Sequence, residues 1–184
     1  MLTPIPIEVI EAAKDGGSAQ IELLVETAWP DAYRLALAIV GERQRAEDAA
    51  QEACIILYRT ISSLRTPAAF RSWFYRIVVR EASEIKRRGI RTEPASQSIV
   101  PTADETASID IWRALSALPH NLRTVVVLAY FEDLKSREIA SILRIPDATV
   151  RFRLMIAKRR LRPLLGNAYE PATHPVNEVR TNAI

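Results

Sequence analysis

The segment from Ser136 to Leu165 constrains the fold more than any other, because apolar residues recur in it at helical spacing on both sides of a short break. The spacing predicts two short helices joined by a tight turn that contains Ile145. The predicted inward positions are Ile139, Ala140 and Leu143 in the first helix, and Val150, Leu154, Ala157 (or Lys158) and Leu161 in the second.

Cations crowd the remaining positions of the second helix, which include Arg151, Arg153, Lys158, Arg159, Arg160 and Arg162. A helix that buries one face and carries cations on the others suits the major groove of duplex DNA. The alternative is a solvated basic helix on an ordinary helical domain.

The 184 residues suffice for one large or two small domains, and 48% of them are hydrophobic, which is ample for a buried core. Five glycines and few alternating runs favour an all-α protein. Charge is unevenly distributed. Residues 1–70 hold six basic and ten acidic side chains, 71–91 hold seven and two, 92–108 hold none and three, and 109–166 hold eleven and five. Two basic blocks on either side of an acidic spacer predict two contacts with one polyanion.

Several classes of site are not expected. Cys54 is the single cysteine, and no metal-ligand spacing appears, so we expect no disulfide, metal or cofactor. The first residues lack the basic start and apolar core of a signal peptide, and no apolar run approaches the roughly 20 residues of a membrane span. We therefore expect a cytoplasmic protein.

The N-terminal region predicts a short helix from Ile7 to about Lys14 and a second helix from about residue 19 to 28. A junction is expected at Pro30, because proline disfavours helical geometry in the preceding residue but suits the first turn of a new helix. The following segment, Tyr33 to Ile39, is largely apolar on all sides and predicts a central core helix.

Residues 45–62 predict a helix with two distinct faces. Its buried stripe comprises Ala46, Ala50, Ala53, Cys54, Leu57 and Ile61. The opposite face carries Glu47, Asp48, Gln51, Glu52 and Ile55. An acidic face with one apolar residue suits a basic protein partner, and the alternative is a solvated charged face.

The next predicted helix begins at Pro67 or Ala68 and combines aromatic with basic residues. It places Phe70, Trp73, Phe74 and Tyr75 within six positions, among Arg71, Arg76, Arg80, Lys86, Arg87, Arg88 and Arg91. This composition is typical of surfaces that stack on unpaired bases and follow a phosphate backbone. A core helix with a basic, solvated end is the alternative.

Residues 92–108 contain two prolines and no cation, which predicts a flexible linker between domains 1–91 and 109–166. The second domain is expected to hold a helix from 109 to 117, another that starts at Pro119, and the helix pair described above. Residues 167–184 show no periodicity, and we expect them to form a disordered tail.

The joint order of these segments resembles a bacterial RNA polymerase sigma factor of the extracytoplasmic-function type, within the sigma-70 family. The resemblance rests on RAEDAAQEACIILY at 45–58, FRSWFYRI at 70–77, the Ala117-Leu118-Pro119 stretch and the helix-turn-helix, and it covers roughly residues 5–166. It implies a protein without catalytic activity that binds core RNA polymerase through its β′ clamp helices and β flap, and that reads promoter DNA.

The resemblance also implies roles for residues. Those expected to bind polymerase are Glu47, Asp48, Gln51, Glu52 and Ile55. The loop 64–69 is expected to hold a flipped base of the −10 element. The expected −10 contacts are Arg65, Thr66, Arg71, Trp73, Tyr75, Arg76, Arg80, Lys86, Arg87 and Arg88, and the expected −35 contacts are Ser136, Arg144, Thr149, Arg151, Phe152, Arg153, Met155 and Arg159.

The helix-turn-helix departs from the family pattern at three informative places, one of which is the start of the second helix, where the common glycine-threonine-valine is Ala148-Thr149-Val150. The usual turn glycine is Arg144, which costs about 1 kcal/mol if the left-handed conformation is needed there. The usual small serine is Phe152, which makes the centre of the second helix apolar. We therefore expect base-specific hydrogen bonds from Thr149, Arg151 and Arg153, and a second role for the apolar patch in binding an anti-sigma factor.

Two other functional classes compete with this interpretation. A dimeric helix-turn-helix repressor would bind duplex DNA without polymerase, but it leaves the acidic and the aromatic-basic helices unexplained. An enzyme is the second alternative, but His120 and His174 are isolated, and no nucleophile–base set or phosphate loop appears.

Overall fold

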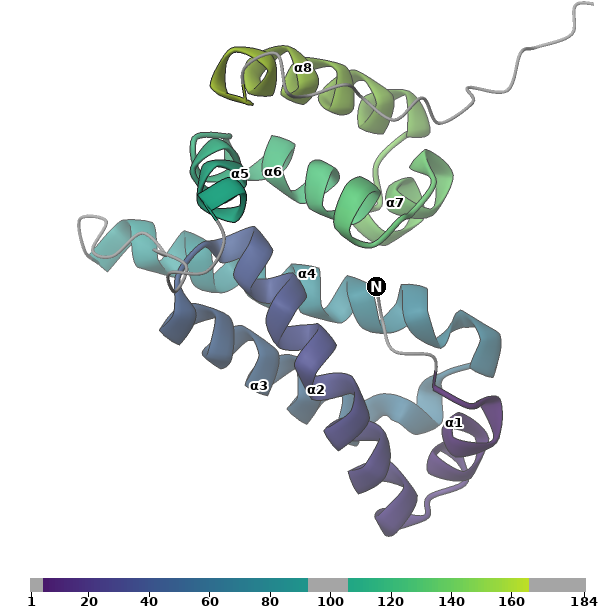
Figure 1. Ribbon diagram of the computed structural model, residues 1–184. Helices are drawn as coiled ribbons and strands as arrows, with labels where there is room; N and C mark the ends of the chain where they lie inside the picture. Colours follow the sequence, from purple (N-terminus) through teal and green to yellow (C-terminus); the bar gives the residue numbers. More distant parts are fainter. Residues whose placement is uncertain (1–4, 93–105, 166–184) are drawn as a thin grey trace, which may run out of the picture.

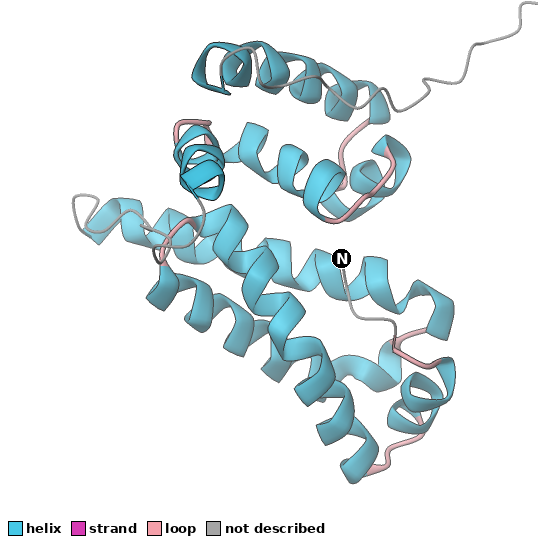
Figure 2. Ribbon diagram, viewed as in Figure 1, coloured by secondary structure: helices cyan, strands magenta, loops and turns pink. Residues whose placement is uncertain are grey.

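The computed structural model describes residues 5–92 and 106–165, and within these ranges the chain is helical and contains no strand (Figures 1 and 2), which confirms the all-α prediction. In chain order the elements are α1 (Ile7–Lys14), α2 (Ser18–Val40), α3 (Arg43–Thr60), η1 (Ile61–Ser63), η2 (Pro67–Ala69), α4 (Phe70–Thr92), α5 (Thr106–Ser116), α6 (His120–Val126), η3 (Val127–Phe131, a π-helical segment), α7 (Ser136–Leu143) and α8 (Asp147–Leu165).

The N-terminal half is built on three mutually packed helices, α2, α3 and α4, with α1 against α2. The predicted small-residue stripe of α3 is buried: Ala46, Ala50 and Ala53 have no exposed surface. Small side chains let helix backbones approach closely, so α3 packs tightly against both neighbours. Its polar face consequently points away from the core.

The predicted junction at Pro30 is wrong, because α2 runs without interruption from Ser18 to Val40 with Pro30 inside it. An interior proline removes one helical hydrogen bond and costs about 3 kcal/mol. Burial on both sides offsets that cost, since Leu24, Leu35 and Ile39 are at most 1% exposed and each contributes about 1.5–3 kcal/mol. Tertiary packing therefore overrides the local signal.

The C-terminal half contains the predicted helix pair, α7 and α8, with α8 packed on α5, α6 and α7. Val150, Ala157 and Leu161 are buried as predicted, and Lys158 is exposed, which settles the open choice in favour of Ala157. The turn between the helices requires the left-handed conformation, because Arg144 has φ 53° and ψ 45°.

The two halves pack against each other, which the sequence did not predict. α4 lies against α7, and α2 lies against α6 and η3, so that α5 to α8 stack over the α2–α4 layer (Figure 1). One buried cluster includes core residues of the N-terminal half together with Val125, Val127, Leu128, Ile139 and Ile142. A second, smaller cluster joins α5, α6 and α8.

Arg123 of α6 ties the C-terminal half to the end of α2. Its side chain is 5% exposed, and its Nη1 lies 3.4 Å from the carbonyl oxygens of both Ile39 and Val40. A cation at this position interacts favourably with the helix dipole. Gly41 permits the approach, because its φ is 83° and a Cβ there would lie 2.9 Å from Arg123 Nη1.

His120, at the start of α6, contacts Ser83 of α4 with 2.9 Å between Nε2 and Oγ. The Ser83 hydroxyl donates its single proton to the carbonyl of Val79, so it can only accept from His120, which assigns the Nε2–H tautomer. Burial, followed by the charges of Lys86 and Arg123, lowers the pKa of His120 to about 4. The interface therefore holds this histidine in its neutral form.

We expect Arg144→Gly to raise the free energy of unfolding by up to about 1 kcal/mol, because glycine adopts the left-handed conformation without a Cβ clash. For a chain of this size the gain corresponds to a Tm increase of about 2–4 °C in a thermal melt. Arg144→Ala is the matched control, since it removes the guanidinium but keeps the Cβ. Equal Tm values for the two variants would contradict the strain at this turn.

We expect the stabilising contribution of His120 to be lost in acid. Its folded-state pKa of about 4 lies below the ordinary value of 6.5, so the unfolded chain binds more protons between these values. The contribution is complete above about pH 6.5 and declines as the pH falls toward 4. His120→Gln, which keeps a donor but does not titrate, should show a shallower fall in Tm; parallel Tm curves would contradict the assignment.

Candidate nucleic-acid and polymerase interfaces

The polar face of α3 is an exposed acidic surface. Glu47, Asp48, Gln51 and Glu52 are exposed, and Ile55 is half-buried. These positions recur at helical spacing and lie opposite the buried alanines. Three carboxylates around one partly exposed aliphatic side chain form a surface complementary to a basic protein partner.

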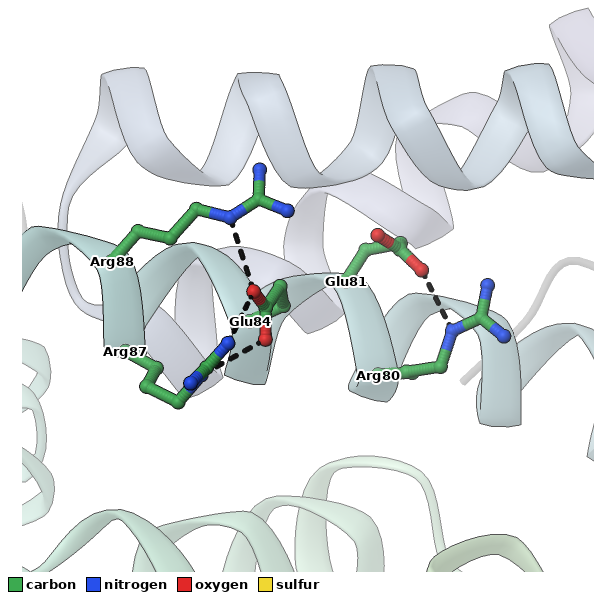
Figure 3. Close-up of polar contacts among 5 residues, drawn as sticks. All are labelled: Arg80, Glu81, Glu84, Arg87 and Arg88. Atoms are coloured by element: carbon green, nitrogen blue, oxygen red, sulfur yellow. Dashed lines mark hydrogen bonds and ion pairs between the residues drawn. The ribbon is translucent and has the colours of Figure 1, made fainter.

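The exposed cations of α4 are paired with carboxylates of the same helix (Figure 3). Arg80 Nε lies 2.8 Å from Glu81 Oε1, and the Glu84 carboxylate accepts from Arg87 at 2.8 and 3.0 Å and from Arg88 at 3.1 Å. Hydrogen bonds from Arg87 lower the pKa of Glu84. These pairs are solvent-exposed, so they are weak and exchangeable for phosphate.

The aromatic residues of α4 have two different roles. Phe70 and Phe74 are buried core residues whose rings stack at 5.6 Å, as their stripe predicted. Trp73 is half-buried, with its ring 6.1 Å from that of Phe70. Tyr75 is only 1% exposed, so in this arrangement it offers no face on which a base can stack.

Tyr75 instead joins the halves. Its hydroxyl donates a hydrogen bond to the carboxylate of Glu132, and Arg71 Nη2 donates to the Glu132 backbone oxygen. The Arg71 guanidinium also lies over the Tyr75 ring, 5.4 Å from its centre. Burial and the Glu132 carboxylate raise the pKa of Tyr75, which keeps the phenol a donor.

The other predicted −10 residues are distributed between surface and interior. Arg65, Thr66, Arg80, Arg87 and Arg88 are exposed, whereas Arg71, Arg76 and Lys86 are half-buried. Burial, and then the charges of Arg123 and Arg45, lowers the pKa of Lys86 to about 8. The exposed set therefore lies in the loop before η2 and on α4, whereas Tyr75 is buried and Arg71, Arg76 and Lys86 are only partly exposed.

The outer surface of α8 presents cations around an apolar centre. Arg151, Phe152, Met155 and Arg159 are exposed, and Phe152 is 58% exposed. Thr149 and Arg153 are half-buried, as is Ser136 on α7, while Arg144 in the turn is exposed. Arg151 is partly neutralised by Asp147 at 3.3 Å. Arg151, Phe152, Met155 and Arg159 thus share the exposed side of α8, whereas Thr149 and Arg153 lie at its half-buried flank.

Sequence reasoning missed the interface residues Glu132, Arg123 and His120. In the sequence His120 is isolated from other titratable groups, and no spacing links it to Ser83, 37 positions earlier. Arg123 carried a local signal, because it interrupts the apolar run that continues through Val125 to Leu128. A lone cation on an otherwise buried helix needs a specific partner.

Other kinds of site are not found within residues 5–92 and 106–165. No group of histidine, cysteine and carboxylate side chains there is arranged to hold a metal ion. No helix in the same part of the chain is long and apolar enough to cross a membrane. Cys54 is buried, which raises its pKa to about 11 and suppresses its reactivity as a thiolate.

Comparison with known proteins gives a family match for a segment in each half of the chain. Residues 24–92 match the family model for sigma-70 region 2, and residues 108–161 match that for sigma-70 region 4. The RNA polymerase sigma factor SigV of Bacillus subtilis is 32% identical over 137 residues, which cover 72% of this chain and 82% of SigV. The ECF RNA polymerase sigma factor SigM of Mycobacterium tuberculosis is 33% identical over 140 residues, covering 73% of this chain and 71% of SigM.

The fold is also similar to that of the sigma factor RpoE of Bartonella quintana, solved in complex with the anti-sigma factor NepR. The TM-score is 0.65 at 20% identity, over 80% of this chain and 95% of the solved one. With both sigma-70 regions present in order and two relatives above 30% identity, the chain belongs to the sigma-70 family of RNA polymerase sigma factors, in its extracytoplasmic-function group.

Proposed function

We propose that this protein binds core RNA polymerase and directs it to specific promoters by contacting two DNA elements. The observation that carries the proposal is the pairing of each family segment with an exposed charged surface. The region 2 segment presents the acidic face of α3 and the exposed arginines of α4, and the region 4 segment presents the basic face of α8. The chemistry of transcription is assigned to the polymerase.

The two family matches also divide the chain into two proposed functional units. We assign residues 1–91 to polymerase docking and the −10 element, and residues 109–166 to the −35 element. The matched segments 24–92 and 108–161 support this division. Most of the proposed linker 92–108, and the proposed tail 167–184, lie outside the described residues.

The acidic face of α3 is the proposed docking surface for the β′ clamp helices of the polymerase, and the β flap is the proposed partner of the region 4 segment. Exposure of Glu47, Asp48, Gln51 and Glu52 supports the first assignment, since complementary charges accelerate and orient association. Ile55 adds a partly exposed apolar contact at the end of the face.

The −10 element is assigned to the loop 64–69 and to α4. Arg65 and Thr66 are exposed in the loop, which supports their assignment to the flipped base. Exposed Arg80, Arg87 and Arg88 are suited to follow the phosphates of the separated strand. Glu81 and Glu84 compete with those phosphates for the same guanidinium groups.

The −35 element is assigned to the exposed side of α8. Arg151 and Arg153 are suited to bidentate bonds with guanine, and Phe152 to contact with thymine methyl groups. A dimeric repressor with the same helix-turn-helix is the competing function, and it would bind such a duplex without polymerase.

An anti-sigma factor is the proposed regulatory partner. The RpoE structure from Bartonella quintana contains the anti-sigma factor NepR, which supports regulation of this kind. The exposed Phe152 and Met155, at 58% and 47%, form the apolar part of the proposed docking surface. We place the protein in the cytoplasm, where it meets polymerase.

We expect the protein to redirect purified core polymerase to new start sites on a promoter library in vitro. Asp48→Lys should weaken binding to core polymerase by at least about tenfold, because it reverses a charge in the docking face. The measurement is a binding titration coupled to transcript mapping. Glu22→Lys, at an exposed position of α2, is the control for charge reversal.

Two outcomes would contradict this function. The first is a protein that alters no start site anywhere in the library. The second is tight, specific duplex binding by the protein alone, without association with polymerase, which would favour the repressor. Equal polymerase affinities for Asp48→Lys and Glu22→Lys would instead move the docking site away from α3.

We expect Glu84→Gln to tighten binding to single-stranded DNA, because it releases Arg87 and Arg88 from a shared carboxylate. The salt dependence should steepen by about 0.7 in the log–log slope for each additional phosphate contact. Glu22→Gln makes the same charge change on another surface. If both variants gain equally in a fluorescence anisotropy titration, net charge rather than the α4 pairs is responsible.

A further inference from the structure

The outermost stripe of α8 is apolar over most of its length. Ala148, Phe152, Met155 and Arg159 follow one another at spacings of four, three and four residues, and all four are exposed. Residues at these spacings lie on one side of a helix, so they form a single ridge, called the α8 ridge below. The ridge lies opposite the side that packs on α5, α6 and α7.

Two large side chains of the α8 ridge are unusually open to solvent. Phe152 is 58% exposed, and Met155, about one turn further along the helix, is 47% exposed. Adjacent exposed apolar side chains of this size mark a contact surface rather than a part of the core. The family pattern has a serine at position 152, so the aromatic ring is a property of this chain.

Cations lie on both flanks of the α8 ridge. At about 100° per residue, the helix places Arg151 and Lys158 on one flank and Arg153 and Arg160 on the other. An apolar ridge between two rows of cations fits the major groove of duplex DNA, where a floor of base edges lies between two phosphate backbones. The double row therefore favours a polyanion as the occupant over an apolar protein segment.

The groove floor offers only one apolar group to such a ridge. In the major groove the base edges present hydrogen-bond donors and acceptors, together with the 5-methyl group of thymine. Ala148, Phe152 and Met155 form no conventional hydrogen bond with a donor or acceptor of a base, and covering such a group without a partner is costly. The α8 ridge therefore favours methyl groups over polar base edges.

The length of the apolar part limits how many bases it covers. Ala148 and Met155 are seven residues apart, which corresponds to about 10 Å along a helix. Successive base pairs are about 3.4 Å apart, so the apolar part spans about three of them. Arg159 continues the ridge beyond this stretch, and hydrogen-bonded readout is left to the flanks.

We propose that the α8 ridge reads the 5-methyl groups of adjacent pyrimidines at the centre of the −35 element. This inference rests on the proposed function, which places α8 on that element. Since 5-methylcytosine carries the same methyl group as thymine, the site takes either base and disfavours unmethylated cytosine. Methylation of a cytosine within the element therefore strengthens binding, which makes promoter choice sensitive to a modification of the DNA.

The test first selects duplexes that bind the full chain from a random-sequence library. In the selected duplex, each enriched thymine is replaced in turn by deoxyuridine, which lacks only the 5-methyl group. At the same positions, cytosine is compared with 5-methylcytosine. The variants are Phe152→Ser and Met155→Ser, and Leu164→Ser is the matched control, because Leu164 is 51% exposed on α8 but lies away from the ridge.

For the wild type, removal of each contacted methyl group should weaken binding about fourfold, and methylation of cytosine should strengthen it by a similar factor. Phe152→Ser should bring at least one of these ratios to about one while keeping its affinity for the deoxyuridine duplex, as a double-mutant cycle requires. Met155→Ser should do the same at a neighbouring position. Leu164→Ser should match the wild type, and circular dichroism establishes that each variant is folded.

A selected pool without enriched thymine would overturn the proposal. So would methyl ratios that persist in both Phe152→Ser and Met155→Ser, because DNA shape would then explain them and the ridge would be left to a protein partner. An equal loss with Leu164→Ser has the same consequence.

The proposed function fails separately from this inference. A protein that reads methyl groups but redirects no polymerase in the transcription test refutes the proposed function and leaves the methyl readout in place. A protein that redirects polymerase without any dependence on methyl groups refutes the inference alone.

Discussion

Burial of aliphatic side chains across both halves is the interaction on which the arrangement depends. Val125, Val127 and Leu128 follow one another at the junction of α6 and η3, and all three are fully buried. They belong to the same cluster as Leu35 and Phe74 of the N-terminal half. Because the hydrophobic effect is non-directional, this burial brings the halves together without specifying their orientation.

Orientation comes from polar groups around that cluster. Tyr75 with Glu132, His120 with Ser83, and Arg123 with the end of α2 each join one half to the other. Hydrogen bonds contribute little net stability but penalise any arrangement that leaves their members buried and unpaired. The same groups also bury Tyr75 between the halves, where it is only 1% exposed.

The sign of the charge differs between the outer surfaces of the protein. The acidic face of α3 is separated from the basic face of α8 by the whole stack of helices (Figure 1), and α4 carries cations neutralised by its own Glu81 and Glu84. Exposed pairs of this kind are weak, so a phosphate backbone displaces them readily. The acidic surface therefore favours a basic partner, and the basic surfaces favour a polyanion.

The sequence by itself determined the all-α fold, the buried stripe of α3 and its exposed acidic face, and the helix pair α7 and α8. These properties follow from periodicity, which places Ala46, Ala50 and Leu57 on one side of a helix and Asp48 and Glu52 on the other, whatever packs against them. The structure shows the left-handed conformation at Arg144, the position at which the family usually has glycine.

Only the tertiary structure decided which residues are exposed and which are covered by another part of the protein. The unbroken course of α2 through Pro30, the burial of Tyr75 and the partnership of His120 with Ser83 depend on surfaces far apart in the chain. Local propensity is a small free energy per residue, whereas burying several large side chains outweighs it. Periodicity states which face of a helix is apolar, but not which part of the protein will cover it.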